Sequence, residues 1–201
     1  MDMELTYIYH SGFALSGDGF TVIMDYYRDS EDGQAQADLN RLMDGTFSNQ
    51  EAGMPEGTVH SELLRRPGKL YVLASHFHPD HFNKEVLQWR EQRPDIIYIF
   101  SKDILRHRRA QKEDAVWLKK GEEYKDETLS VRAFGSTDVG VSFLLQASGK
   151  KIFHAGDLNN WHWKEESTGE EVREAENAYF SELDVISRHV GRIDLVMFPV
   201  D

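Results

Sequence analysis

Short apolar stretches separated by turn residues recur along the chain and predict β-strands. We expect strands at residues 5–9, 20–24, 70–74, 96–100, 122–125, 128–134, 141–146, 150–155 and 193–199. Helical spacing of apolar residues predicts helices at 36–43, 58–66, 83–92, 102–111 and 170–188. The first two strands are expected to form a hairpin through Gly17-Asp18-Gly19. Strands and helices in this order predict a layered α/β fold.

Two segments outside the strands are predicted to contribute to the core and to the functional site. The predicted helix at 170–188 carries an apolar stripe that we interpret as core, made of Ala175, Ala178, Tyr179, Leu183 and Ile186. Residues 46–57 are rich in glycine, serine and asparagine, and we expect them to border a functional site as a lid. A flexible surface loop is the alternative for that segment.

Metal-binding side chains follow the predicted strand at 70–74. His76, His78, Asp80 and His81 occupy four of six consecutive positions. In extended backbone, His76 and His78 point to the same side, and Asp80 and His81 are expected to project from the next helix toward a second point. Any one of these histidines could be an ordinary hydrogen-bonded residue. Desolvating all of them together without a cation would be costly, so the pattern predicts ligands for two neighbouring metal ions.

The run His76-Phe77-His78-Pro79-Asp80-His81 resembles the HxHxDH signature of the metallo-β-lactamase superfamily. The similarity extends to Asp25 at the end of an early strand and to Phe153-His154-Ala155-Gly156-Asp157, which is similar to the family's GD motif. The resemblance implies an α/β fold, the four-layer αβ/βα sandwich of the metallo-β-lactamase type, as a single domain at 1–201. It also implies that Asp157 bridges two metal ions and that Asp25 supports the site. The alternative for each of these aspartates is an ordinary carboxylate in a turn.

Two departures from the family pattern concern metal ligands. The third histidine of the first ion is missing from residues 133–140. Asp138, or as a weaker alternative Ser136 or Thr137, could replace it with an oxygen ligand, or Asp138 could simply cap a turn. A last histidine for the second ion, which relatives carry on a further helix and strand, is also missing. We therefore expect that the domain lacks those elements, that a partner completes the site, or that Asp80, His81 and Asp157 hold the second ion loosely.

Neither of two other histidines is favoured as a metal ligand. His189 on the predicted C-terminal helix is a weak substitute, and His10 at the end of the first strand is expected to be structural. A missing edge would expose core surface, so self-association into a homo-oligomer is an expected option.

Composition narrows the chemistry of the site. The chain has no cysteine, so ligands must be nitrogen and oxygen, and we expect one or two divalent ions, zinc first, with manganese or iron as alternatives. An aspartate such as Asp138 among the ligands would favour the harder ions. The net charge of −12 opposes nucleic-acid binding. An acidic start and the lack of a long apolar run predict a cytoplasmic protein with no membrane partner.

These features predict a metal-dependent hydrolase that uses a metal-bound hydroxide on an ester, amide or phosphoester-type small-molecule substrate. Asp80, besides being a ligand, is the candidate catalytic residue that orients the hydroxide and takes its proton. Trp161 and His162, shortly after Asp157, are candidate substrate contacts, with local packing of the tryptophan as the alternative. The rival function is a non-catalytic metal-binding member of the fold with a scaffolding or sensing role.

Overall fold

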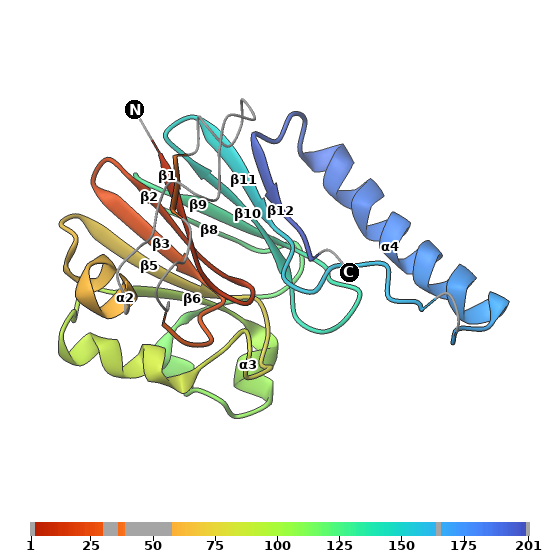
Figure 1. The fold of residues 1–201 in the computed structure, drawn as a ribbon, viewed down its shortest axis with the longest axis horizontal. Helices are drawn as coiled ribbons and strands as arrows, with labels where there is room; N and C mark the ends of the chain where they lie inside the picture. The colour runs from red at the N-terminus through yellow and green to blue at the C-terminus, as the bar shows by residue number, and fades with distance from the viewer. Residues whose placement is uncertain (1–2, 30–35, 39–57, 164–165, 200–201) are drawn as a thin grey trace. The chain divides into compact units, whose positions relative to one another are not determined.

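The computed structural model describes residues 3–29, 36–38, 58–163 and 166–199 (Figure 1). The chain divides into two compact units, Met1–Trp117 and Leu118–Asp201. That residues 1–201 form one domain lacking its last helix and strand stays a prediction. Among the described helices, none combines the length and the apolar composition that a membrane crossing requires.

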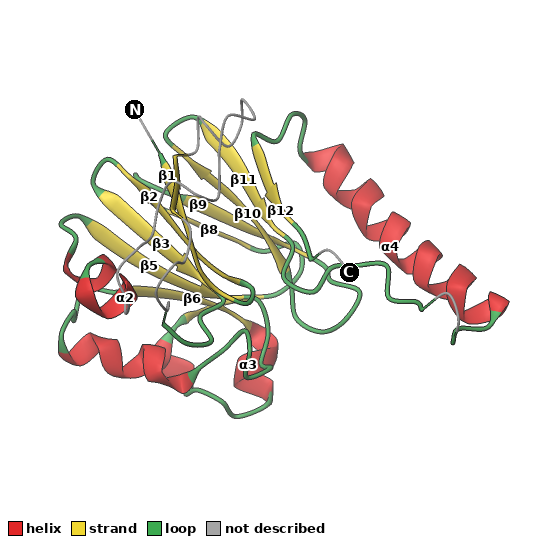
Figure 2. Ribbon diagram, in the orientation of Figure 1, coloured by secondary structure: helices red, strands yellow, loops and turns green. Residues whose placement is uncertain are grey.

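The N-terminal unit is built on a seven-stranded mixed sheet in the order β4-β1-β2-β3-β5-β6-β7 (Figures 1 and 2). β1 pairs antiparallel with β2 and β4, β2 pairs antiparallel with β3, and β3, β5 and β6 run parallel. β1, β3, β5 and β6 therefore all end at the same edge of the sheet. The strands are β1 (Glu4–Tyr9), β2 (Gly12–Gly17), β3 (Phe20–Met24), β4 (Gln36–Asp38), β5 (Lys69–Ala74), β6 (Ile97–Ser101) and β7 (Val116–Leu118).

The predicted N-terminal hairpin is wrong in one respect, because β2 lies between the two strands that were expected to pair. β1 turns into β2 through His10 and Ser11, and β2 turns into β3 at Asp18 and Gly19. The pattern of residues did not predict β2. Most residues of this strand are buried, so polar and apolar positions do not alternate along it, and the glycine at each of its ends is typical of a turn.

Two predicted helices also differ from the structure. Residues 36–38 form strand β4, which pairs with β1, instead of the start of a helix. Residues 39–43 and the proposed lid at 46–57 lie outside the described part of the chain. The helix predicted at 102–111 is the shorter α3 (Lys102–Arg106), and Arg108 shortly after it has a φ of 54°, a left-handed conformation that a continuing helix does not allow.

Helical segments cover a hydrophobic core on the N-terminal sheet. They are α2 (Thr58–Ser61), two 3₁₀ segments, η1 (Leu63–Arg65) and η2 (Lys84–Glu91), and α3. Val86 and Trp89 of η2 are buried, as the sequence predicted, and they join a cluster with Ile23, Val72 and Ile104. β5 is part of this core and ends at Ala74, and the metal-type residues begin two positions later.

The C-terminal unit contains a five-stranded sheet in the order β12-β11-β10-β9-β8 and one long helix. Its neighbouring strands are antiparallel except for the parallel pair β11 and β12, so β9 and β11 end at the same edge. The elements are β8 (Glu123–Lys125), β9 (Ser130–Phe134), β10 (Ser142–Ala147), β11 (Lys150–His154), α4 (Gly169–His189) and β12 (Leu195–Met197). A further 3₁₀ segment, η3 (Lys112–Asp114), belongs to the N-terminal unit.

The apolar stripe of α4 is core only in part. Ile186 is buried, and Tyr179 and Leu183 pack partly buried against the core of this unit. Ala178 is exposed, which corrects its assignment to the core. A capping box begins the helix, in which the Thr168 side chain accepts from the backbone N–H of Glu171.

Candidate metal centre

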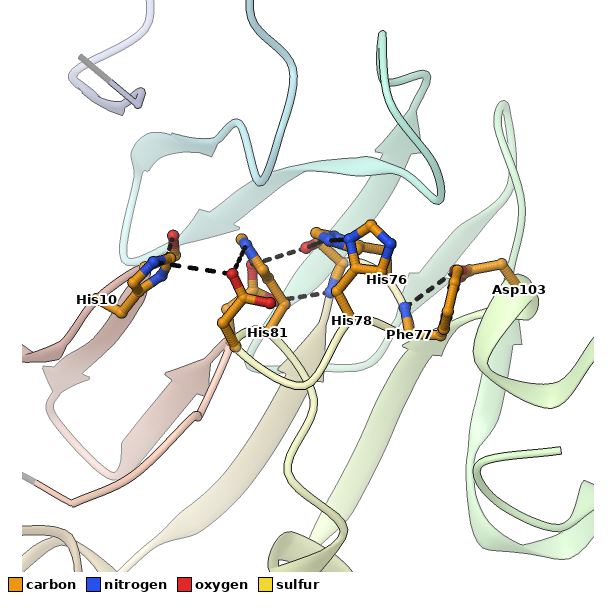
Figure 3. A network of polar contacts seen from close by, with 10 residues as sticks. His10, His76, Phe77, His78, His81 and Asp103 are labelled. Atoms are coloured by element: carbon orange, nitrogen blue, oxygen red, sulfur yellow. Dashed lines mark hydrogen bonds and ion pairs between the residues drawn. The ribbon is translucent and has the colours of Figure 1, made fainter. Parts of the chain in front are cut away.

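Three imidazoles gather in the loop that follows β5 (Figure 3). The carbonyl of His78 accepts hydrogen bonds from the backbone N–H groups of His81, at 3.0 Å, and Phe82, at 2.8 Å, which folds the loop back on itself. His76 Nε2 lies 3.0 Å from His78 Nδ1, and the rings of His76 and His81 have centroids 4.0 Å apart. His76 and His81 are buried. The turn thus brings His76, His78 and His81 together.

A second set of contacts anchors this loop to α3. The backbone N–H of Phe77 donates to Asp103 Oδ2 at 3.0 Å (Figure 3). The ring of Phe77 stacks on His107 with centroids 3.7 Å apart. Phe77 therefore holds the loop between the two metal-type histidines, which is why an apolar residue stands among them.

Asp25 supports the histidines from the end of β3. It is fully buried and has a φ of 48°, and its Oδ1 accepts from the Ser75 backbone N–H at 2.7 Å. Its Oδ2 accepts from Ser75 Oγ at 2.7 Å and from His81 Nδ1 at 2.9 Å. Of the two roles that the sequence left open for Asp25, the structure shows the supporting one.

These hydrogen bonds determine the tautomers of two histidines. An ionised carboxylate only accepts, so His81 Nδ1 must carry the proton that it donates to Asp25. Ser75 gives its single hydroxyl proton to Asp25, so the 3.0 Å contact between Ser75 Oγ and His76 Nδ1 must be donated by His76. In neutral His76 and His81, the lone pair is therefore on Nε2, the form in which an imidazole binds a metal.

Asp80 lies between two imidazoles. Its Oδ2 is 3.7 Å from Nε2 of His81 and 3.7 Å from Nε2 of His10. One ligand atom from each of His10, Asp80 and His81 lies within 4.8 Å of the others. The sequence did not indicate His10 as part of this group. The signal that would have found it is the direction of β1, which ends at the same edge as β3 and β5.

Two carboxylates approach each other in the C-terminal unit. Asp138 follows β9, Asp157 follows β11, and each has a ligand oxygen within 4.8 Å of the other. Thr137 ties the two loops together, because its Oγ1 donates to the Asn159 carbonyl at 2.5 Å and accepts from the Asn159 N–H at 3.0 Å. Two anions held this close favour a cation between them.

The residues after Asp157 have mixed surroundings. The Trp161 indole N–H donates to the Asp157 carbonyl at 3.0 Å, so this side chain tethers the backbone of the candidate ligand. His162 Nδ1 is buried, and the described residues offer it no hydrogen-bond partner. His189 is exposed, and its Nδ1 donates to the Val185 carbonyl at 2.7 Å. That hydrogen bond satisfies a carbonyl in the last turn of α4, which is a structural role at the end of the helix.

Comparison with known proteins identifies the family. The sequence matches the family described as "Beta-lactamase superfamily domain" over residues 4–172. The match spans well over half of the chain, so the protein belongs to the metallo-β-lactamase superfamily, as the His76 to His81 signature had indicated. No curated protein matches the sequence.

Solved structures share the fold at low sequence identity. CmlA, a diiron β-hydroxylase from Streptomyces venezuelae, superposes with a TM-score of 0.59 at 16% identity over 97% of this chain and 34% of its own. The metallo hydrolase Igni18 from Ignicoccus hospitalis superposes with a TM-score of 0.50 at 19% identity, over 78% of this chain and 61% of its own. A metallo-β-lactamase from Cronobacter sakazakii superposes with a TM-score of 0.53 at 12% identity, over 93% of this chain and 72% of its own. The chain thus spans about a third of the length of CmlA, and these likenesses confirm the predicted α/β fold of the metallo-β-lactamase type.

The donors fit a divalent metal ion. Imidazole nitrogen and carboxylate oxygen are the ligands that zinc takes when thiolates are absent, and they also suit iron and manganese. Two of the imidazoles, His76 and His81, are buried with their tautomers set for coordination. A cation accounts for three imidazoles and a carboxylate packed at one turn better than hydrogen bonding alone does.

Proposed function

We propose that the protein is a metal-dependent hydrolase that acts on a small-molecule ester, amide or phosphoester. One observation carries the proposal. Through Ser75, Asp25 sets the tautomer of His76, and directly it sets that of His81, so both buried imidazoles present Nε2 lone pairs at the end of β5. Membership of the metallo-β-lactamase superfamily supports it, because metal-dependent hydrolases make up most of that superfamily.

The ligand assignment is part of the proposal and rests on the family resemblance and on donor chemistry. His76 and His78 would hold one ion together with Asp138, and Asp80 and His81 would hold the second. Asp157 would be a ligand of both. We propose zinc, with iron or manganese as alternatives, since CmlA is described as a diiron enzyme. Bound there, divalent ions act as Lewis acids that polarise the substrate oxygen and activate water near neutral pH.

The remaining chemistry falls to side chains. Asp80 is 40% exposed, so solvent and substrate reach a carboxylate that we propose takes the proton of the attacking water. Trp161 and His162 are proposed substrate contacts. The buried Nδ1 of His162, which has no partner among the described residues, is the kind of group that a bound ligand satisfies.

Elemental analysis of the purified protein, with a panel of small esters and phosphodiesters, tests the proposal. Asp157→Ala should lose metal and activity together. Asp184→Ala, which removes an exposed carboxylate on α4, is the matched control and should keep both. Full metal content in Asp157→Ala would refute its ligand role. A wild-type protein that binds metal but turns over no substrate with any divalent ion would favour the non-catalytic rival.

A further inference from the structure

His10 occupies a left-handed backbone position that few residues other than glycine adopt, although histidine is among the types enriched there. It is the first residue of the two-residue turn between β1 and β2, with a φ of 54°. Glycine is favoured at such a position, because a side chain crowds the backbone when φ is positive. A residue in such a conformation, at the edge where the candidate metal centre lies, is a candidate functional residue.

The spacing of the atoms around Asp80 differs from that of a hydrogen-bonded pair. The two contacts of Asp80 Oδ2, to His10 Nε2 and to His81 Nε2, are both 3.7 Å, beyond the usual limit of about 3.2 Å for an N–H···O bond. Two ligand atoms that each lie about 2.1 Å from one tetrahedral ion are about 3.4 Å apart. The observed separations are therefore closer to those of ligands that share an ion.

The orientation of the His10 ring also fits coordination. Its Nδ1 lies 3.2 Å from Ser11 Oγ, and its Nε2 points toward Asp80. The ring forms a T-shaped pair with Tyr27, with centroids 6.1 Å apart. His81 has the same arrangement, with Nδ1 hydrogen-bonded to Asp25 and Nε2 3.7 Å from Asp80. A ligating histidine characteristically has its other ring nitrogen hydrogen-bonded in this way.

We propose that His10 is a ligand of the second metal ion, together with Asp80 and His81. It would supply an imidazole nitrogen to that ion, beside the carboxylate of Asp80 and the imidazole of His81. This inference rests on the proposed function in one point, that Asp80 and His81 bind metal. All three residues belong to the N-terminal unit, so their described geometry comes from one compact body.

Cobalt titration of the full chain, after chelation and dialysis, tests the assignment. The variant His10→Asn removes the imidazole, and asparagine tolerates a positive φ. Wild-type protein should bind two equivalents of Co²⁺. In His10→Asn the affinity for the second equivalent should fall at least tenfold, with the first unchanged. Paramagnetic proton NMR of the cobalt-loaded protein should lose one shifted imidazole N–H signal.

His60→Asn is the matched control. The side chain of His60 is 41% exposed, against 47% for His10, and its Nε2 also contacts a carboxylate, Glu85, at 2.6 Å. Among the described residues, no third histidine, aspartate or glutamate joins that pair in a metal-type group, so both equivalents should bind as in wild type. His10→Gly, in which the backbone strain is removed, replaces His10→Asn if circular dichroism shows a folding defect.

Three outcomes would overturn the assignment. Second-site affinity within twofold of wild type in His10→Asn would exclude His10 as a ligand and leave the proposed function intact. A single equivalent in wild-type protein would mean that there is no second ion for His10 to hold. Wild-type protein that binds no cobalt and no zinc would refute the proposed function together with this inference.

Discussion

Asp25→Asn separates the charge of the supporting carboxylate from its shape. Asparagine is nearly isosteric and tolerates the φ of 48° at this position, so the backbone can stay as it is. In the wild type, Asp25 Oδ2 accepts from Ser75 Oγ and from His81 Nδ1. If the remaining side-chain oxygen of asparagine keeps the contact with the Ser75 N–H, an NH₂ group takes the place of Oδ2. An NH₂ group cannot accept, so both of those donors must rearrange.

The magnitude follows from these contacts. The Ser75 hydroxyl can turn and accept from the new amide, so the main loss is the charge-assisted bond to His81, about 1.5–3 kcal/mol in the free energy of unfolding. To accept from the amide, His81 must move its proton to Nε2, the atom that faces Asp80. That tautomer cannot bind metal through Nε2. We therefore expect metal affinity to fall about 10–100-fold, as for other residues that support a ligating histidine.

Urea unfolding with a chelator present measures the first effect, and calorimetric titration with Zn²⁺ measures the second. Asp29→Asn is the control, because Asp29 also accepts two backbone N–H bonds, from Val59 at 2.8 Å and His60 at 3.0 Å, and neither donor belongs to a candidate ligand. It should lower stability and leave zinc affinity unchanged. Zinc affinity of Asp25→Asn within twofold of wild type would refute the argument from the tautomer.

Two further predictions concern residues around the site and the core. Burial raises the pKa of Tyr98 to about 12 and that of Tyr26 above its ordinary value, so stability that is complete below about pH 10 should be lost as the pH rises through 12. In a titration to high pH, absorbance at 295 nm should show a late tyrosinate component that coincides with the loss of circular dichroism. That component should shrink in Tyr98→Phe. A tyrosinate component that appears before unfolding would contradict the assignment. Trp161→Phe removes the indole donor to the Asp157 carbonyl and should cost about 1 kcal/mol in urea unfolding, while Trp163→Phe, at a side chain 58% exposed, should cost less than about 0.5 kcal/mol. An unchanged KM in Trp161→Phe would mean that Trp161 only holds the backbone of Asp157 in place and does not contact substrate.

Part of this protein could be predicted from local sequence. His76, His78, Asp80 and His81 stand within six positions, so any compact turn brings their side chains near one another. Most strands and the long helix α4 were also predicted, because period-2 and period-3.6 patterns report which face of a local segment is buried. The signature and these patterns together sufficed for the fold class.

Tertiary structure decided which distant residues join that turn. Asp25 is 56 positions from His81 in the sequence, and the contact between them forms because β3 runs parallel to β5 and ends beside it. His10 comes to the same edge because β2, the strand hidden from the sequence pattern, turns the chain so that β1 also ends there. Periodicity describes each strand alone and contains no information on strand order. Contacts between strand ends depend on that order, so they emerged only from the folded sheet.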